Sequence, residues 1–525
     1  MKTTLTATTA LALLALPALA DGHADYTLHI LHINDLHSRI EPINGFDSTC
    51  SAEDDAAGEC FGGVARLKTH LDGLRAELEG ENVLVLDAGD QFQGSLMYTT
   101  YKGDVEAEMM NAIGFDAMAV GNHEFDDGPE QLAEFAGEVD VPLVSGNLDL
   151  SQSNVLGADE VADHLILEVG GERIGIVSAL ATDTVETSSP GDAVIFQDEV
   201  DALQADVDAL RGEGVNKIIA LTHVGLPRDR EIAEAVDGLD AIVGGHSHTL
   251  LSNTEEGAEP YPTEVNGVPI VQAGAYGKYV GHLTLAFDAD GAVVEATGDT
   301  ALIDASVEPD PEIAAAVAER AGPIEALKAQ VIGEASDAIE GDREVCRAQE
   351  CAMGNLVADA MLDRVADQGA VLAIQNGGGL RASIDAGEIT MGEVLTVLPF
   401  QNTLATFEAT GQDILDALEN GVSEVEEGGG RFPQVAGMTY RADLTAEPGS
   451  RIVEATVGGE PIDPEATYLA ATNNYVRNGG DGYSMFSDAE NAYDFGPGLE
   501  QVVADYIAAQ GGSYTPYTDG RIAVE

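Results

Sequence analysis

Five short polar clusters, each directly after an apolar run, constrain the fold of this chain more than any other feature. One of them, GNHEFD at 121–126, follows the apolar run 117–120. Asn and His are costly to bury without partners, so their place at the end of an apolar run calls for a reason. Such an arrangement is typical of a buried strand whose carboxyl end carries a ligand site. The other four clusters lie at 34–37, 87–94, 222–223 and 244–248.

Short apolar runs alternate with amphipathic stretches from Tyr26 to about Asp304. This alternation predicts an α/β layered domain. The predicted strands are 28–34, 83–86, 141–144, 174–180, 217–221 and 241–243, with helices at 64–78 and 198–210. The segment from about 309 to 331 has a helical pattern broken by Gly322-Pro323, and we interpret it as a linker helix. At 525 residues the chain is long enough for two domains.

The first twenty residues have the pattern of a secretory signal peptide. A short basic start, Met1-Lys2, precedes an apolar run at 11–19 that is too short to span a bilayer. The chain ends without a hydrophobic tail, so we expect no membrane anchor. These features predict an exported protein, periplasmic or secreted.

The charge balance is strongly acidic, with 23 Lys and Arg against 93 Asp and Glu and a net charge of −70. A surface of this kind repels nucleic acid and anionic lipid, so we expect neither as a partner. It also repels phosphate compounds at long range, and an enzyme for such substrates would need local positive charge from metal ions or arginines.

Four cysteines form two close pairs in the sequence, Cys50 with Cys60 and Cys346 with Cys351. Export permits disulfides, and local pairing is the simplest of three connectivities. A cysteine metal site is the alternative, but no second CxxC-like pair supports it.

The five polar clusters contain five of the eleven histidines, together with Asp and Asn residues. Oxygen and imidazole ligands suit hard and borderline divalent ions. Seven such ligands can hold two ions if one carboxylate bridges them, as in two-metal hydrolases. The sequence therefore predicts a dimetal site at the carboxyl ends of the strands.

Two glycine-rich segments of the second half carry the features of a ligand pocket. In NGGGLR at 376–381, three glycines let backbone approach a ligand, and an arginine just beyond them can bind phosphate or carboxylate. The segment 473–483 adds an aromatic ring and a carboxylate, and Phe400 adds a second ring. Two rings can hold a base between them.

The ordered motifs DxH, GDxxxG, GNHEFD, xH and GHxH resemble the calcineurin-like metallophosphoesterase superfamily. With the motifs of the second half, nearly the whole chain resembles the 5′-nucleotidase family, which includes bacterial periplasmic UDP-sugar hydrolases and animal ecto-5′-nucleotidase. The resemblance implies a four-layer αββα metallophosphoesterase domain joined by a linker helix to a smaller α/β nucleotide-binding domain. The implied boundaries are a signal peptide at 1–20, the first domain at 21–308, the linker at 309–332 and the second domain at 333–525.

The resemblance also assigns roles to individual residues. It implies one ion bound by Asp35, His37, Asp90 and His248, and a second bound by Asp90, Asn122, His223 and His246. It implies a catalytic dyad of His123 and Asp126. It implies base stacking by Phe400 and Tyr475, sugar contacts by Asn376 and Asp481, phosphate-side arginines at Arg347 and Arg381, and close backbone approach at Gly378 and Gly379. A histidine at 248, where family members often have Gln or Asn, leaves the metal open among zinc, manganese and cobalt.

The implied function is a metal-dependent 5′-nucleotidase of nucleotide catabolism, acting as a monomer or homodimer. Related activities stay open: UDP-sugar hydrolysis, 3′-nucleotidase with 2′,3′-cyclic phosphodiesterase activity, or thiosulfohydrolysis. The non-enzymatic alternative is a nucleotide-binding protein, which the complete set of ligand and dyad positions disfavours.

Overall fold

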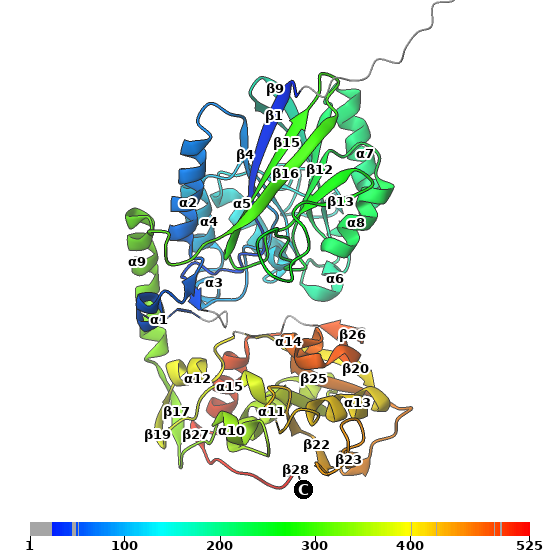
Figure 1. Cartoon of the computed structure of the whole chain (residues 1–525). Helices are drawn as coiled ribbons and strands as arrows, with labels where there is room; N and C mark the ends of the chain where they lie inside the picture. Colours follow the sequence, from blue (N-terminus) through cyan, green and yellow to red (C-terminus); the bar gives the residue numbers. More distant parts are fainter. Residues whose placement is uncertain are drawn as a thin grey trace, which may run out of the picture.

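The computed structural model describes residues 24–44, 49–50, 52–400, 402–426, 428–487, 489–493 and 496–524, and the predicted signal peptide at 1–20 lies outside these residues. The chain forms two domains, one above the other in Figure 1, with the long helix α9 (Pro311–Lys328) along one side of both.

The first domain is built on two six-stranded sheets. The first sheet has the order β16 (Val293–Leu302), β15 (Tyr279–Phe287), β1 (Tyr26–Ile33), β4 (Val83–Asp87), β5 (Ala117–Ala119), β6 (Leu143–Val144). The second has the order β13 (Thr263–Val265), β14 (Val268–Val271), β12 (Ala241–Gly244), β11 (Lys217–His223), β9 (Glu172–Leu180), β8 (His164–Val169). Two short pairs lie beside them, β2 (Ile43–Asn44) with β3 (Cys60–Phe61) and β7 (Leu148–Asp149) with β10 (Ile195–Phe196).

Helices cover the outer face of each sheet, which gives the four layers αββα. The helices of the first domain are α1 (Ala52–Ala57), α2 (Val64–Glu77), α3 (Leu96–Tyr101), α4 (Asp104–Ile113), η1 (His123–Phe125), α5 (Pro129–Glu138), α6 (Thr184–Thr187), α7 (Glu199–Gly212) and α8 (Leu226–Ala235). Figure 1 shows α2 and α4 on one side of the domain and α7 and α8 on the other.

Alternation along the strands explains this layering. In β1, Ile30 belongs to the apolar cluster shared with the second sheet, whereas Leu31 packs in the cluster that contains residues of α2 and α4. Strand β11 is buried at every position, as expected for a parallel strand covered on both faces. The start of α7 is fixed by Asp198, whose side chain accepts hydrogen bonds from the backbone of Val200 and Asp201.

Within each sheet, the strands that carry the polar clusters run parallel to one another. In the first sheet β1, β4 and β5 pair in parallel, and in the second sheet β11 and β12 do the same. Because parallel strands end at the same edge of a sheet, the loops after them meet there. The fold thus brings the five clusters to one edge of the first domain.

Helix α9 differs in one respect from the sequence prediction. The predicted break at Gly322-Pro323 is wrong, since α9 continues through Pro323 as one helix. Gly322 has no Cβ to clash with the proline ring, which removes much of the usual restriction on the residue before a proline. Ile313, Val317 and Ile324 are buried along the helix and hold it in place.

The second domain contains a five-stranded mixed sheet with the order β21 (Pro433–Ala436), β18 (Leu372–Asn376), β25 (Thr467–Asn473), β20 (Leu404–Thr410), β26 (Glu490–Tyr493). Smaller sheets have the orders β19 (Gly387–Thr390), β17 (Val331–Ala335), β27 (Ser513–Tyr514) and β24 (Glu460–Pro461), β23 (Ile452–Val457), β22 (Met438–Ala442), β28 (Ile522–Val524). The helices are α10 (Arg343–Cys346), α11 (Ala352–Val365), η2 (Ala366–Gln368), η3 (Gly377–Gly379), α12 (Met391–Val397), α13 (Gly411–Gly421), α14 (Asn474–Arg477), η4 (Gly480–Gly482), η5 (Ser484–Phe486) and α15 (Leu499–Ala509).

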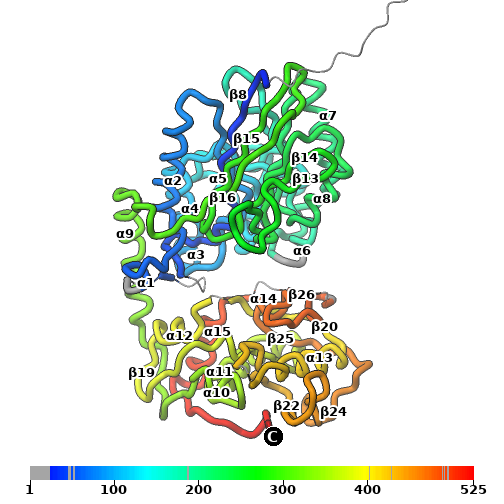
Figure 2. Tube along the Cα trace, in the orientation of Figure 1, coloured from blue at the N-terminus to red at the C-terminus, as the bar shows by residue number. Residues whose placement is uncertain are grey.

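The two domains face each other across the edge that carries the polar clusters. In Figure 2, α6 of the first domain lies opposite α14 and β26 of the second. The structure contains the two predicted disulfides, Cys50–Cys60 and Cys346–Cys351. Within the described ranges, no helix combines the length and the apolar character needed to cross a bilayer.

Candidate active site

The predicted metal ligands lie at the end of β11 and in the loops after β1, β4, β5 and β12, and several of them have an unusual backbone. Residues other than glycine rarely adopt positive φ, and such strained positions concentrate at functional sites. Five of the seven predicted ligands have positive φ: Asp35 (52°), His37 (50°), Asp90 (60°), His246 (76°) and His248 (52°). The backbone of these loops therefore bends sharply where a ligand is expected.

One group of donor atoms is formed by Asp35, His37 and His248, which lie close enough together to hold an ion. His248 Nε2 is 3.2 Å from Asp35 Oδ1 and 2.9 Å from His37 Nε2. His37 Nε2 also lies 3.7 Å from Asp90 Oδ2. The four residues predicted for the first ion thus converge in the structure.

A second group is formed by Asp90, His223, Asn122 and His246. Asp90 Oδ2 is 3.1 Å from His223 Nε2, and His246 Nδ1 is 2.8 Å from Asn122 Oδ1. The same oxygen of Asp90 therefore faces both groups. This is the position that a bridging carboxylate would occupy.

The hydrogen bonds of His223 test whether this set suits a cation. Its Nδ1 donates to the carbonyl oxygen of Ala88 at 2.7 Å, so in the neutral ring Nε2 carries the lone pair that a metal ion can take. His223 is fully buried, and Nε2 has no hydrogen-bond partner of suitable geometry although Asp90 Oδ2 is near. Two acceptor atoms that face each other in a buried site repel unless a cation lies between them. The donor set fits a divalent metal ion.

His123 and Asp126 form the predicted pair beside these ligands. Asp126 Oδ2 accepts a hydrogen bond from His123 Nδ1 at 2.7 Å, and Asp126 Oδ1 accepts one from Ser188 Oγ at 2.8 Å. Burial alone would lower the pKa of His123, but the charges of Asp126 and Asp90 outweigh it and raise that pKa to about 9. The ring is thus oriented by a carboxylate and favours the protonated form.

All eight residues predicted to bind substrate line one cavity of about 440 Å³ in the second domain. Asn376 Nδ2 and the Tyr475 hydroxyl donate to the two oxygens of Asp481 at 2.7 and 3.0 Å. Gly378 is required there, because a Cβ at this position would lie 2.9 Å from the Cα of Gly430. Phe400 lies beside Arg381, whose guanidinium carbon is 5.3 Å from the centre of the ring.

Positive charge gathers in this cavity although the chain is strongly acidic. Burial, and then the nearby charge of Arg343, lower the pKa of both Arg347 and Arg381. Charges of one sign in a partly buried site favour a ligand of the opposite sign. The cavity therefore suits an anionic group beside the two aromatic rings.

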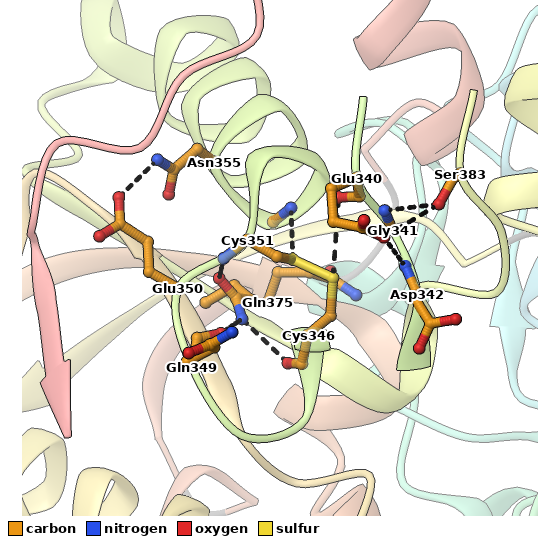
Figure 3. The surroundings of a disulfide bond; sticks show 12 residues. Glu340, Gly341, Asp342, Cys346, Gln349, Glu350, Cys351, Asn355, Gln375 and Ser383 are labelled. Carbon is orange, nitrogen blue, oxygen red and sulfur yellow. Dashed lines mark hydrogen bonds between the residues drawn. A yellow bond between two sulfur atoms is a disulfide. The ribbon is translucent and has the colours of Figure 1, made fainter. Parts of the chain in front are cut away.

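The Cys346–Cys351 disulfide closes the short loop that carries Arg347. Figure 3 shows this loop packed against the start of α11. Gln434 Nε2 donates to the carbonyl oxygens of Cys346 and Gln349 at 2.9 and 2.8 Å, which ties the loop to β21. Arg347 Nη1 donates to the Gly428 carbonyl at 3.1 Å. The disulfide and the Gln434 hydrogen bonds thus hold the backbone around Arg347, and the bond to Gly428 holds the end of its side chain.

The cavity of the second domain adjoins a second cavity of about 430 Å³, which is lined by five of the seven predicted metal ligands, His37, Asp90, Asn122, His246 and His248. Four residues line both: Arg39, Tyr276, Phe400 and Asn402. The sequence alone assigned no role to five residues of the site: Arg39, Tyr276, Asn402, Ser188 and Arg477. Of these, Arg477 also lines the cavity that the metal ligands line. Arg39 lies two residues after His37, which is the only local signal that could have marked it.

Two protein families match this chain. The calcineurin-like phosphoesterase family matches residues 28–250, and the 5′-nucleotidase C-terminal domain matches residues 331–488. A 5′-nucleotidase of Homo sapiens is 38% identical over 530 residues, 95% of this chain and 91% of that protein. A trifunctional nucleotide phosphoesterase of Bacillus subtilis (strain 168) is 38% identical over 541 residues, 96% of this chain, and this chain spans only 35% of that protein. The crystal structure of a 5′-nucleotidase precursor from Thermus thermophilus is similar to this one, with 40% identity, a TM-score of 0.64, and coverage of 95% of this chain and 99% of that one.

Proposed function

Because the chain belongs to the 5′-nucleotidase family of calcineurin-like phosphoesterases, we propose that it releases phosphate from nucleoside 5′-monophosphates. It is a metal-dependent phosphoric monoester hydrolase. The observation that carries the substrate proposal is the shared wall of the two cavities, lined by Arg39, Tyr276, Phe400 and Asn402. A ligand held by the second domain can thus extend to the metal ligands of the first.

The proposed metal site holds two divalent ions, zinc, manganese or cobalt. Asp35, His37, Asp90 and His248 would bind one, and Asp90, Asn122, His223 and His246 the other. When bound, a pair of this kind neutralises phosphoryl oxygens and lowers the pKa of a bound water. The protein contributes the loop geometry that brings the seven side chains together.

His123 has the proposed role of general acid. In its protonated form it would donate a proton to the leaving oxygen of the substrate or stabilise the charge that develops there. Asp126 fixes the ring so that Nε2 is directed away from the carboxylate, and Ser188 fixes Asp126 in turn. The carboxylate of Asp126 raises the pKa of His123 and so favours the protonated ring.

The cavity of the second domain has the proposed role of nucleotide recognition. Phe400 and Tyr475 would hold the base by stacking, which contributes about 1–3 kcal/mol per stacked base. Asn376 and Asp481 would bind the sugar hydroxyls, and Arg347 and Arg381 would bind on the phosphate side. Gly378 and Gly379 would let the backbone approach the ligand.

The proposed setting is the periplasm or the extracellular medium. Two pairs of cysteines joined as disulfides are compatible with an oxidising compartment. A net charge of −70 favours a small-molecule partner over nucleic acid.

A panel of substrates tests the proposal. Phosphate release is measured with 5′-AMP, 3′-AMP, 2′,3′-cyclic AMP and UDP-glucose under the same metal conditions. We expect the highest kcat/KM with 5′-AMP. A higher value with UDP-glucose or the cyclic nucleotide would replace the proposed substrate with one of the related activities.

A further inference from the structure

The carboxylate of Glu124 holds two ligand-bearing loops together by hydrogen bonds to their backbone. Its Oε2 accepts from the amide nitrogens of Asp90 at 3.0 Å and Gly121 at 2.7 Å. Its Oε1 accepts from Gln91 at 2.7 Å and Phe92 at 3.2 Å. One side chain thus binds four backbone N–H groups, three in the loop after β4 and one in the loop after β5.

These two loops contain predicted ligands of both ions. Asp90, the proposed bridge, is itself one of the four donors, and Asn122 directly follows Gly121. The loops are also in direct contact, because the amide of His123 donates to Asp90 Oδ1 at 2.9 Å. The position of Glu124 therefore affects the distance between the bridging carboxylate and the amide ligand.

The loops leave little freedom for another arrangement. A Cβ on Gly121 would lie 2.2 Å from Asp90 Oδ1 and 2.5 Å from the Asp90 backbone nitrogen, so the two segments leave no room for a side chain at position 121. Asp90 has a φ of 60°, a conformation that costs free energy for a residue other than glycine. Four hydrogen bonds to one buried carboxyl group can offset this cost, because each satisfies a backbone N–H group that would otherwise be buried without a partner.

We propose that Glu124 is a positioning residue that preorganises the dimetal site before the metal binds. It touches neither the substrate nor the ions, and it acts through Asp90 and Asn122. It is fully buried, so its carboxylate is available to these two loops alone and not to a ligand. This inference rests on the proposed metal ligands but not on the proposed nucleotide substrate.

The first test measures binding of Mn²⁺ alone, without substrate, to the wild-type chain and to Glu124→Gln by titration calorimetry. Glutamine has the same shape, but its NH₂ group would face two of the four backbone donors and cannot accept from them. Loss of a group that orients metal ligands typically weakens metal binding by about 10–100-fold, and we expect a weakening in that range.

Glu419→Gln is the matched control. Glu419 also binds backbone amides through both carboxylate oxygens, but in the second domain. These oxygens accept hydrogen bonds from the amides of Arg451 and Ile452 at 2.8 Å each. We expect this variant to bind Mn²⁺ as the wild type does. Unfolding of the metal-free variants by denaturant separates lost stability from lost positioning. A Glu124→Gln protein that binds two Mn²⁺ ions with wild-type affinity would overturn the proposal.

Amide hydrogen exchange of the wild-type chain decides the matter if Glu124→Gln does not fold. We expect the amides of residues 90–92 and 121 to be protected in the metal-free protein, and to change little when Mn²⁺ is added. Rapid exchange without metal, followed by protection with Mn²⁺, would show that the metal and not Glu124 orders the loops. Failure of the wild-type chain to bind Mn²⁺ would overturn this inference and the proposed metal site together, whereas a different preferred substrate would affect only the proposed function.

Discussion

Replacing both Phe400 and Tyr475 with alanine should weaken nucleotide hydrolysis far more than hydrolysis of a phosphate ester without a base. Tyr475 is 46% exposed in the absence of ligand, so its ring contributes little to the apolar core. Both rings line the cavity that holds Asn376 and Asp481. Stacking is the interaction that these two rings can offer in such a place.

The size of the effect follows from the number of stacked faces. Each face of the base is worth about 1–3 kcal/mol by alanine substitution, so two faces give about 2–6 kcal/mol. Since about 1.4 kcal/mol corresponds to a factor of ten, kcat/KM for 5′-AMP should fall by at least about 30-fold. Hydrolysis of p-nitrophenyl phosphate, which has no nucleobase to stack, should change far less.

Two control variants separate stacking from other effects. Tyr475→Phe keeps the ring but removes the hydroxyl that donates to Asp481 at 3.0 Å, and it should keep most of the activity. Tyr517→Ala removes a tyrosine that is 38% exposed and lines no part of the cavity, and it should leave both substrates unaffected. Equal losses of kcat/KM on 5′-AMP and p-nitrophenyl phosphate in the double variant would refute base stacking by these rings.

Three further predictions concern the proton donor, a buried carboxylate and the acidic surface. His123→Ala should lower kcat by about 10²–10⁴-fold, the usual loss for a general acid, while elemental analysis still finds two metal ions per chain; loss of an ion would mean that His123 is a ligand. Burial raises the pKa of Glu500 from 4.5 to about 7, so the folded state binds this proton more tightly than the unfolded state does. Ionisation of Glu500 therefore destabilises the folded state increasingly as the pH rises from 4.5 to 7. Glu500→Gln should therefore raise the free energy of unfolding by about 3 kcal/mol at pH 8 and by almost nothing at pH 4.5, and denaturant unfolding with no difference at pH 8 would contradict this. The melting temperature should rise between low and molar sodium chloride, because salt screens repulsion among 93 acidic residues; a flat or falling value would count against that reasoning.

The layered fold was predictable because its signal is local. Residues 218–221 are all apolar and lie in β11, a strand buried on both faces, and this burial is what favours an apolar sequence there. Boundaries were less accurate: the first predicted strand began at Leu28, whereas β1 begins at Tyr26. The first two residues of β1 are only half-buried, so they lack the apolar signal of the rest of the strand. The break predicted at Pro323 was wrong because the context of Gly322 and of the buried side chains of α9 outweighs the usual effect of proline.

Some residues of the site were likewise predictable from the sequence and others were not. Asp35, Asp90 and His223 could be found because each follows an apolar run, and the fold gathers the ends of parallel strands. The positioning role of Glu124 could not be predicted, because its four hydrogen-bond partners are backbone amides, which carry no signal in the sequence. Arg39 and Asn402 face the same space only because the two domains adjoin, and no local pattern encodes that.

Phosphate release from 5′-AMP before and after metal removal tests the central claim most directly. The protein is treated with EDTA, its metal content is verified by elemental analysis, and manganese, cobalt or zinc is then added back. The dimetal account predicts that activity disappears with the metal and returns when about two ions per chain are bound. Full activity in protein verified to be metal-free would contradict it.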